Sequence, residues 1–338
     1  MKAREQVMVN PDCGGRPPTP RYPLLALIGA LAAAACQGTA AQAATTKLTL
    51  AISGLSEGKL PIYVAGDQGF FKAAGLSLDI LEFRSGTEAV QTFVGGSADF
   101  CICAADHEVI LRGRGLDVKL ISGLDAHYPN ALVAKSTSAA SDIAALKGRK
   151  IGITAPGSST DNLLRWALAR AGLDAARDVD IVSVGTGLAM RAAIESGAID
   201  AGILGNAEII EAQRDGRALK VIVDWRTTEA AALNVIARQK WIDQNRDVAH
   251  AFVQAVAKGA KLIQADHRAA VAGVRQIFPE KDAGFVEALT SSSIERLSKD
   301  GSISPIGFAN TVEIIRQSDP ALQPVKLEDV NLQPELVR

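Results

Sequence analysis

The sequence predicts an α/β protein of two similar lobes, each a sheet flanked by helices. One pattern occurs twice, about a hundred residues apart: helix, Gly-Leu stop, strand, small hydroxyl residue, helix, glycine stop, strand. The first copy occupies residues 72–103 and the second residues 169–204. Strands that alternate with helices favour parallel sheets with helices on both faces. The length of 338 residues is also sufficient for two domains.

The composition is that of an ordinary soluble globular protein, with 48 % apolar and 22 % charged residues. Aromatic residues make up only 4 % of the chain, and the net charge is −1. The low aromatic content argues against a stacking surface for single-stranded nucleic acid, and the net charge provides no global basic field to attract polyanions. We expect no nucleic-acid partner.

The N-terminus has the pattern of an export signal. Basic residues precede an apolar run at residues 24–35, which is too short to span a bilayer but suits a signal peptide. The small-x-small pattern at residues 41–43 predicts cleavage after Ala43, so that residues 1–43 form the signal peptide. Either Met1 or Met8 is the start.

The same region leaves open whether the exported chain is anchored by lipid or free in the periplasm. Cys36 lies in a segment that loosely resembles a lipoprotein box, which would anchor the mature chain to a membrane through lipid. Without that modification the chain would be free in the periplasm. In either case we expect a periplasmic location.

The first lobe begins with a strand at residues 47–52 and a loop, followed by a helix that starts near Pro61 and stops at Gly75. Alternating apolar residues predict the next strands, and the polar segment 136–141 marks the end of the lobe. The further strands expected before this boundary are residues 78–83, 100–103, 118–122 and 130–134.

The second lobe opens with a short helix at residues 142–148 and a strand at residues 150–154, and its last strand is residues 219–224. A strand at residues 233–237 then returns to the first lobe. Amphipathic helices follow, and we expect them to pack on the first lobe; they are residues 247–265, 268–277, 283–298 and 307–316. The domains expected are residues 44–134 plus 229–338 for lobe one and residues 135–228 for lobe two, with crossings near residues 135 and 229.

Ligands of such sheets bind beyond the carboxyl ends of the strands, and this rule selects the loop at residues 156–161. Three hydroxyls and a run of free N–H groups at a helix N-terminus can hold an anion. Helix capping alone is the alternative explanation. The residues selected in this loop are Gly157, Ser158, Ser159 and Thr160.

Other loops at the same edge supply further candidates for ligand contact. Some are small hydroxyl residues and a glycine in the loop after the first strand and at the starts of the repeated helices: Ser53, Ser85, Gly86, Thr87 and Thr186. Others are polar residues that follow later strands: His127, Asn206 and Glu208.

No catalytic or metal-binding motif is evident. Cys101 and Cys103 are two residues apart in a strand, which we expect to place them poorly for a disulfide, as two buried thiols. In the segment Asp106–Glu108, Asp106 is expected to cap a helix and Glu108 to interact with its dipole. We therefore expect no metal, no cofactor and no enzymatic activity.

Several short motifs together resemble the nitrate/sulfonate/taurine group of ABC-transporter solute-binding proteins. The motifs are Pro61 with Gly69-Phe70-Phe71 and Gly75-Leu76, Gly96-x-x-Asp99-Phe100, residues 146–152, residues 156–159, Leu164 with Ala171-Gly172-Leu173, and Gly197-x-x-Asp200-Ala201. The resemblance covers roughly residues 47–275. It implies a monomeric periplasmic-binding-protein fold of type II with two crossings, which closes by hinge motion on a small solute and docks on a membrane permease.

This chain departs from the pattern of that group at two places. Gly205-Asn206-Ala207 stands where many members have Trp-Glu-Pro, and Cys101 replaces the usual Gly. A specificity for nitrate, taurine or alkanesulfonate is therefore not carried over, and the expected ligand is a small anionic or polar organic solute. The alternatives are an enzyme on the same fold, of the type that makes cofactor or pyrimidine precursors, with its site near Cys101, Cys103 and His107, and a ligand-sensing receptor.

Overall fold

The computed structural model describes residues 45–217 and 219–338. The predicted signal peptide, its cleavage site and Cys36 lie outside the described residues. Within the described residues, none of the helices combines the length and the apolar character needed to span a bilayer. The description that follows concerns residues 45–217 and 219–338 only.

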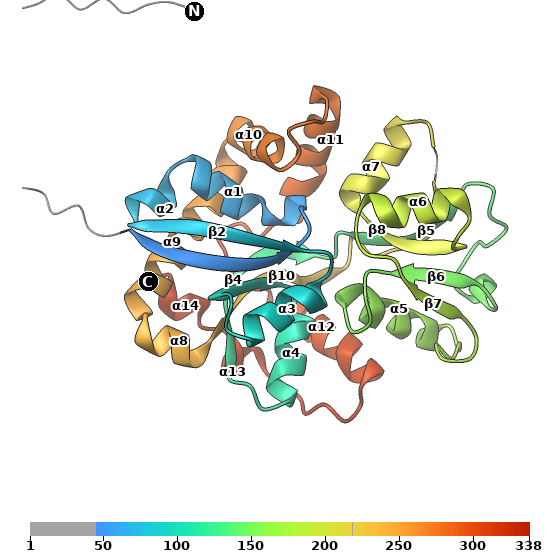
Figure 1. The fold of residues 1–338 in the computed structure, drawn as a ribbon, viewed down its shortest axis with the longest axis horizontal. Coiled ribbons are helices and arrows are strands. Elements are labelled where there is room, and N and C mark those ends of the chain that lie inside the picture. Colours follow the sequence, from blue (N-terminus) through green and yellow to red (C-terminus); the bar gives the residue numbers. More distant parts are fainter. Residues whose placement is uncertain (1–44, 218) are drawn as a thin grey trace, which may run out of the picture. The chain divides into compact units, whose positions relative to one another are not determined.

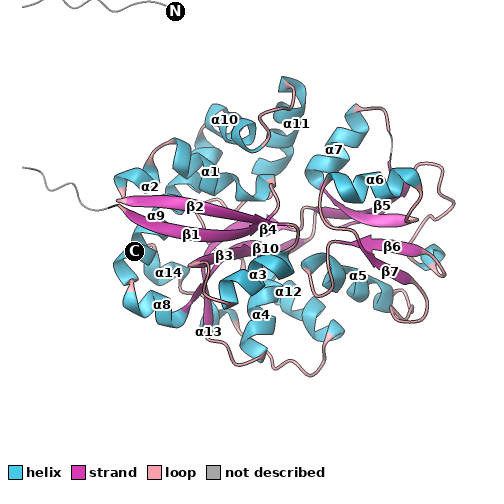
Figure 2. Cartoon of the chain, in the orientation of Figure 1, coloured by secondary structure: helices cyan, strands magenta, loops and turns pink. Residues whose placement is uncertain are grey.

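The described chain contains two five-stranded sheets with helices on both faces of each (Figures 1 and 2). The first sheet has the order β2-β1-β3-β10-β4. β1 is parallel to β2 and β3, whereas β10 is antiparallel to β3 and β4. Its strands are β1 (Thr46–Ser53), β2 (Leu76–Phe83), β3 (Phe100–Cys103), β4 (Val118–His127) and β10 (Glu229–Arg238).

The second sheet repeats this arrangement with the order β7-β6-β8-β5-β9. β6 is parallel to β7 and β8, whereas β5 is antiparallel to β8 and β9. Its strands are β5 (Asn130–Lys135), β6 (Lys150–Ile153), β7 (Asp180–Ser183), β8 (Ala201–Gly205) and β9 (Leu219–Asp224). The repeat in the sequence therefore corresponds to two sheets of the same topology, as the fold class predicted.

Two aspartates hold equivalent strand pairs together at the start of each parallel ladder. Asp99 Oδ2 accepts a hydrogen bond from the Thr49 N–H at 2.8 Å, which ties the loop before β3 to β1. Asp200 Oδ2 accepts from the Lys150 N–H at 2.9 Å and ties the loop before β8 to β6. The two aspartates of the repeated motif thus make the same cross-strand connection in both lobes.

The helices of the first half are η1 (Glu57–Lys59), α1 (Leu60–Asp67), α2 (Phe70–Ala73), α3 (Gly86–Val94) and α4 (Ala105–Gly113). Those of the second lobe are η2 (Ala144–Leu146), α5 (Ser159–Arg170), α6 (Leu188–Ser196) and α7 (Asn206–Arg214). The expected helix at residues 142–148 is only the single 3-10 turn η2, because Lys147, its C-cap, already leaves the helical conformation.

The chain passes between the sheets twice, after β4 and after β9. Residues 130–134 belong to the second sheet, since β5 pairs with β8 and β9. The first crossing therefore precedes Asn130, whereas we expected it near residue 135. The second crossing leads into β10, which begins at Glu229 in the first sheet.

The C-terminal helices are α8 (Gln239–Gln244), α9 (Arg246–Ala265), α10 (His267–Ile277), α11 (Ala283–Ile294), α12 (Pro305–Ser318), α13 (Leu327–Val330) and α14 (Gln333–Leu336). α9 packs on α1 and buries Phe252 against Phe71 and Phe100 in the core of the first lobe. α12 contacts β10 and α4 and also α5 of the second lobe. We expected the C-terminal helices to pack on the first lobe alone, but α12 contacts both lobes.

Candidate functional site

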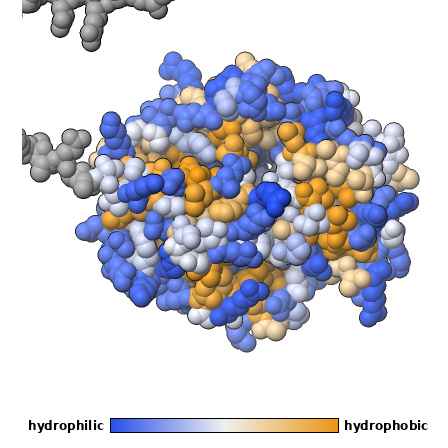
Figure 3. All heavy atoms as spheres, in the orientation of Figure 1, coloured by the Kyte–Doolittle hydropathy of each residue, from blue (hydrophilic) through white to orange (hydrophobic). Residues whose placement is uncertain are grey.

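A pocket lies at the carboxyl ends of parallel strands from both sheets. Its lining includes the residues at the ends of β1, β3 and β8 and the residue after β6, as the rule for such sheets predicts. It contains about 1050 Å³ of space, part of it open to solvent. The molecule is hollowed where the two lobes meet (Figure 3). The pocket is large enough for a small organic molecule.

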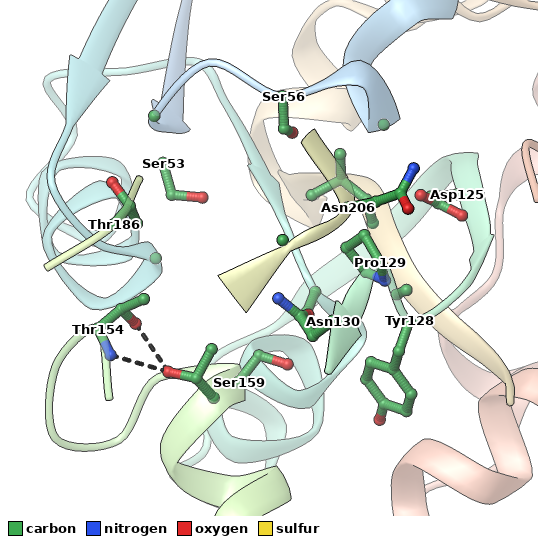
Figure 4. Close-up of a pocket in the computed structure, with 18 of the residues that line it drawn as sticks. Ser53, Ser56, Asp125, Tyr128, Pro129, Asn130, Thr154, Ser159, Thr186 and Asn206 are labelled. Atoms are coloured by element: carbon green, nitrogen blue, oxygen red, sulfur yellow. Dashed lines mark hydrogen bonds between the residues drawn. The ribbon is translucent and has the colours of Figure 1, made fainter. Parts of the chain in front are cut away.

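Hydroxyl groups line one side of the pocket, around the N-terminus of α5 (Figure 4). Ser158 caps this helix by accepting a hydrogen bond from the Asp161 N–H. The Thr154 hydroxyl donates to Ser158 Oγ at 2.8 Å and lies 3.0 Å from Thr160 Oγ1. These three hydroxyls are thus occupied by one another. The hydroxyl of the half-buried Ser159 has no such partner among the described residues, which leaves it able to contact a ligand.

Eight of the twelve residues selected from the sequence line the pocket: Ser53, Gly86, Ser158, Ser159, Thr160, Thr186, Asn206 and Glu208. They come from the two lobes, and the fold brings them to a single cavity. A Cβ at Gly86 would lie 2.7 Å from His107 Nε2, so only glycine leaves room for the histidine that shares this lining.

The other four selected residues do not line the pocket. Ser85 caps α3 by accepting from the Glu88 N–H, and the Gly157 N–H donates to Asp161 Oδ2. Thr87 Oγ1 donates to the Pro156 carbonyl at 3.3 Å and so connects the two lobes. His127 Nδ1 lies 3.4 Å from the carbonyl oxygen of Arg296.

The two lobes also contact each other beside the pocket. The Asn162 amide, on α5, donates to Asp106 Oδ2, on α4, at 2.8 Å, and both side chains are buried. The Asn206 amide, on α7, donates to Ser292 Oγ, on α11, at 2.8 Å. Asp106 therefore connects the lobes; it is not the N-cap that we expected, because α4 begins at Ala105 and has Ala104 as its cap.

The opposite side of the pocket is acidic and buried. The Arg296 guanidinium donates to Glu57 Oε1 at 3.0 Å and to Asp125 Oδ2 at 3.3 Å. Burial raises the pKa of Asp125 to about 6, although Arg296 opposes this effect. Lys59 Nζ donates to the Ser53 carbonyl and to Ser56 Oγ, and burial lowers the pKa of its ammonium to about 8.

Glu57, Lys59 and Asp125 line the pocket but were not selected from the sequence. Glu57 and Lys59 lie in a segment that we interpreted only as a loop, and Asp125 lies in a strand whose residues are mostly buried. One feature of the sequence could have identified Glu57 and Lys59: they closely follow β1, at the edge of the sheet where ligands bind. Their ion-pair partner Arg296 is distant in the sequence, so the burial of Glu57 and Asp125 could not be inferred from the sequence.

Cys101 and Cys103, which we expected as two buried thiols, project from the same face of β3 with their sulfur atoms in contact and their Cα atoms 5.6 Å apart. Cys103 and His107 both line the pocket, and they are the residues named above for an enzymatic alternative.

Comparison with known proteins gives a family and a fold. The model of the family described as NMT1/THI5 like matches residues 58–270. The 4-amino-5-hydroxymethyl-2-methylpyrimidine phosphate synthase of Uromyces fabae is 27 % identical over 71 % of this chain and 73 % of its own length. A solved structure from Bordetella bronchiseptica RB50 is 30 % identical, with a TM-score of 0.74 over 85 % of this chain and 94 % of the other.

The periplasmic aliphatic sulphonate binding protein SsuA of Escherichia coli has the same fold, with a TM-score of 0.64 and 16 % identity over 87 % of this chain and 99 % of its own. The two-lobe periplasmic-binding-protein fold is therefore confirmed. The relative from Uromyces fabae, however, is named as an enzyme. This finding contradicts our expectation that the chain is not an enzyme, because relatives that match it are named for a reaction.

The family assignment rests on more than half of the chain and agrees with the resemblance described above, since the matched segment extends from η1 into α10 and includes both crossings. The chain belongs to the NMT1/THI5-like family.

Proposed function

We propose that this chain binds a small polar or charged organic solute between its lobes and delivers it to the permease of an ABC importer. The observation that carries the proposal is the pocket itself, which both lobes line with polar side chains and in which the Ser159 hydroxyl is available. Closure by a hinge at the two crossings would enclose the solute. Export to the periplasm is part of the proposal, as is a monomeric receptor.

A thermal-shift screen of the chain from residue 44 tests this proposal. The panel comprises sulfonates, nitrate, carboxylates, aromatic acids, amines and pyrimidines. A ligand that binds only the folded chain should stabilise it by about 2.7 kcal/mol at a hundredfold excess over Kd. The proposal requires that a compound raises the Tm and is recovered unchanged. A screen in which no class raises the Tm would contradict it.

A second candidate function is an enzyme of the pyrimidine-precursor type. Two observations favour it: the relatives that are named as synthases, and the position of His107 and Cys103 in the lining of the pocket. Mass spectrometry of each ligand recovered from the screen distinguishes the two functions. A product that accumulates with time would support the enzyme, and an unchanged ligand would support the receptor.

Replacement of Ser159 with alanine should weaken the binding of a ligand found in the screen. The loss of one hydrogen bond is expected to raise Kd by about three- to tenfold. Titration calorimetry measures this change. The stability of the unliganded chain should remain within about 0.5 kcal/mol, since Ser159 is not the cap.

Ser158→Ala is the matched control for this prediction. It removes the cap of α5 and should lower the free energy of unfolding by about 0.5–2 kcal/mol. An unchanged Kd in Ser159→Ala would remove this hydroxyl from the binding site, whatever the effect of the control.

A further inference from the structure

The pocket has an excess of acidic groups at one end. Glu57 and Asp125 come from the first lobe and Glu208 from the second, and all three line the cavity. The cations at this end are Lys59 and Arg296, and Arg296 is shared by Glu57 and Asp125. When all these groups are ionised, three carboxylates stand against two cations.

Glu208 is the carboxylate that lacks a cation. It lies in the first turn of α7, and its oxygens lie close to the backbone of two glycines: a Cβ at Gly205 would be 2.7 Å from Oε2, and one at Gly187 would be 3.5 Å from Oε1. The charged groups that perturb it, within the described part of the chain, are the carboxylates of Glu57 and Glu211. Its neighbour Asn206 is hydrogen bonded to Ser292 and Arg226 and does not compensate the charge.

The carboxylate at this position is costly to ionise while the pocket contains no cation. Desolvation, with the nearby Glu57 and Glu211 carboxylates, raises the pKa of Glu208 to about 7, although hydrogen bonds from the backbone N–H groups of Glu208 and Gly205 oppose this shift. A positive group within hydrogen-bonding distance would favour the ionised form of Glu208, because its attraction compensates for the hydration that the carboxylate loses on burial. Charge-assisted hydrogen bonds of this kind are roughly twice as strong as neutral ones.

We infer that the solute carries a cationic nitrogen group, an ammonium or an amidinium, which the Glu208 carboxylate binds at the acidic end of the pocket. The Ser159 hydroxyl at the N-terminus of α5 then contacts the other, polar or anionic end of the same molecule. The inference rests on the proposed function and narrows its solute to molecules with a positive nitrogen. Nitrate and simple alkanesulfonates do not meet this requirement.

The test compares sets of molecules of similar shape but different charge. Benzamidine, benzamide and benzoate form one set; butylguanidine and butylurea form another, in which a neutral ureido group replaces the guanidinium. Calorimetry gives Kd for the chain from residue 44, for Glu208→Gln and for the exposed control Glu313→Gln. The unliganded Tm of each variant shows whether it is folded.

We expect the cation to bind more tightly than its neutral analogue by about tenfold or more in the unmodified chain and in Glu313→Gln. In Glu208→Gln this preference should fall to within about threefold, while the Kd of the neutral analogue is unchanged. Tighter binding of the neutral or anionic molecule, or a preference that survives in Glu208→Gln, would overturn the inference but leave the proposed function intact. If no compound in these sets or in the broader screen binds, the proposed function fails together with it.

Discussion

Replacement of Arg296 with methionine is expected to lower the free energy of unfolding by about 3–5 kcal/mol. Methionine keeps much of the length of the side chain but leaves the carboxylates of Glu57 and Asp125 without their shared cation. Both residues are only 2 % exposed, so water does not replace the lost interaction. Chemical denaturation followed by circular dichroism measures the change.

The control for this prediction is Arg268→Met. Arg268 forms an exposed ion pair with Asp266 at 3.7 Å, and its side chain is 94 % exposed. Such pairs contribute about 0–1 kcal/mol. If the two methionine variants had similar stabilities, the buried charges around Arg296 would not be coupled in the way that the structure indicates. Neutralising one carboxylate in the double variant Arg296→Met/Asp125→Asn should restore part of the loss.

Replacement of Glu108 with glutamine should stabilise the protein at alkaline pH. Glu108 is fully buried on α4, and neither of its carboxylate oxygens has a hydrogen-bond partner among the described residues. Burial raises the pKa of this carboxyl from 4.5 to about 8. At roughly 1.4 kcal/mol per unit, the shift corresponds to a contribution on the order of 5 kcal/mol.

The sign of this effect follows from the protonation of the two states. Below about pH 4.5 Glu108 is protonated in both the folded and the unfolded chain, and its contribution to stability is fully present. As the pH rises toward 8, the unfolded chain ionises first, and the contribution is lost. The glutamine of Glu108→Gln does not titrate. The free energy of unfolding of this variant should therefore lie within about 1 kcal/mol of the unmodified chain at pH 4.5 and exceed it by several kcal/mol at pH 8.5.

Urea denaturation at several pH values measures both chains, and the exposed Glu280→Gln is the control. The control should follow the pH dependence of the unmodified chain. A Glu108→Gln curve parallel to that of the unmodified chain would show that this carboxyl is ionised or hydrogen bonded in the folded protein.

The sequence was sufficient to predict the two lobes because the signals that define them are local. Glycines such as Gly75 and Gly197 end helices, and Asp99 and Asp200 occur at the same place in each repeat. The hydroxyl side of the pocket was predicted for the same reason, since a helix N-terminus after a strand is visible in a short window of sequence. β5 was assigned to the wrong sheet because pairing with β8 and β9 depends on distant residues.

The acidic side of the pocket could not be predicted in this way. Glu57 and Asp125 are buried together only because Arg296, at the end of α11, reaches both of them. The same limit applies to Glu108, which occupies the first-turn position where we expected a carboxylate that interacts with the helix dipole. Its burial follows from the packing of α4 on β4 and α12. These groups depend on tertiary contacts, and a pattern of helix ends and strands does not indicate them.

The position of β10 in the first sheet has a consequence for the order in which the lobes are completed. Among the described strands of that sheet β4 pairs with β10 alone, and β10 is made after all the described strands of the second sheet. During synthesis, β1 to β3 on one side and β4 on the other have no strand between them until residue 238 has emerged, whereas the strands of the second sheet are contiguous in residues 130–224. The lobe that the chain begins is thus the lobe that it finishes last. Until then the newly made chain exposes unpaired strand edges to other chains, which is a condition that promotes aggregation.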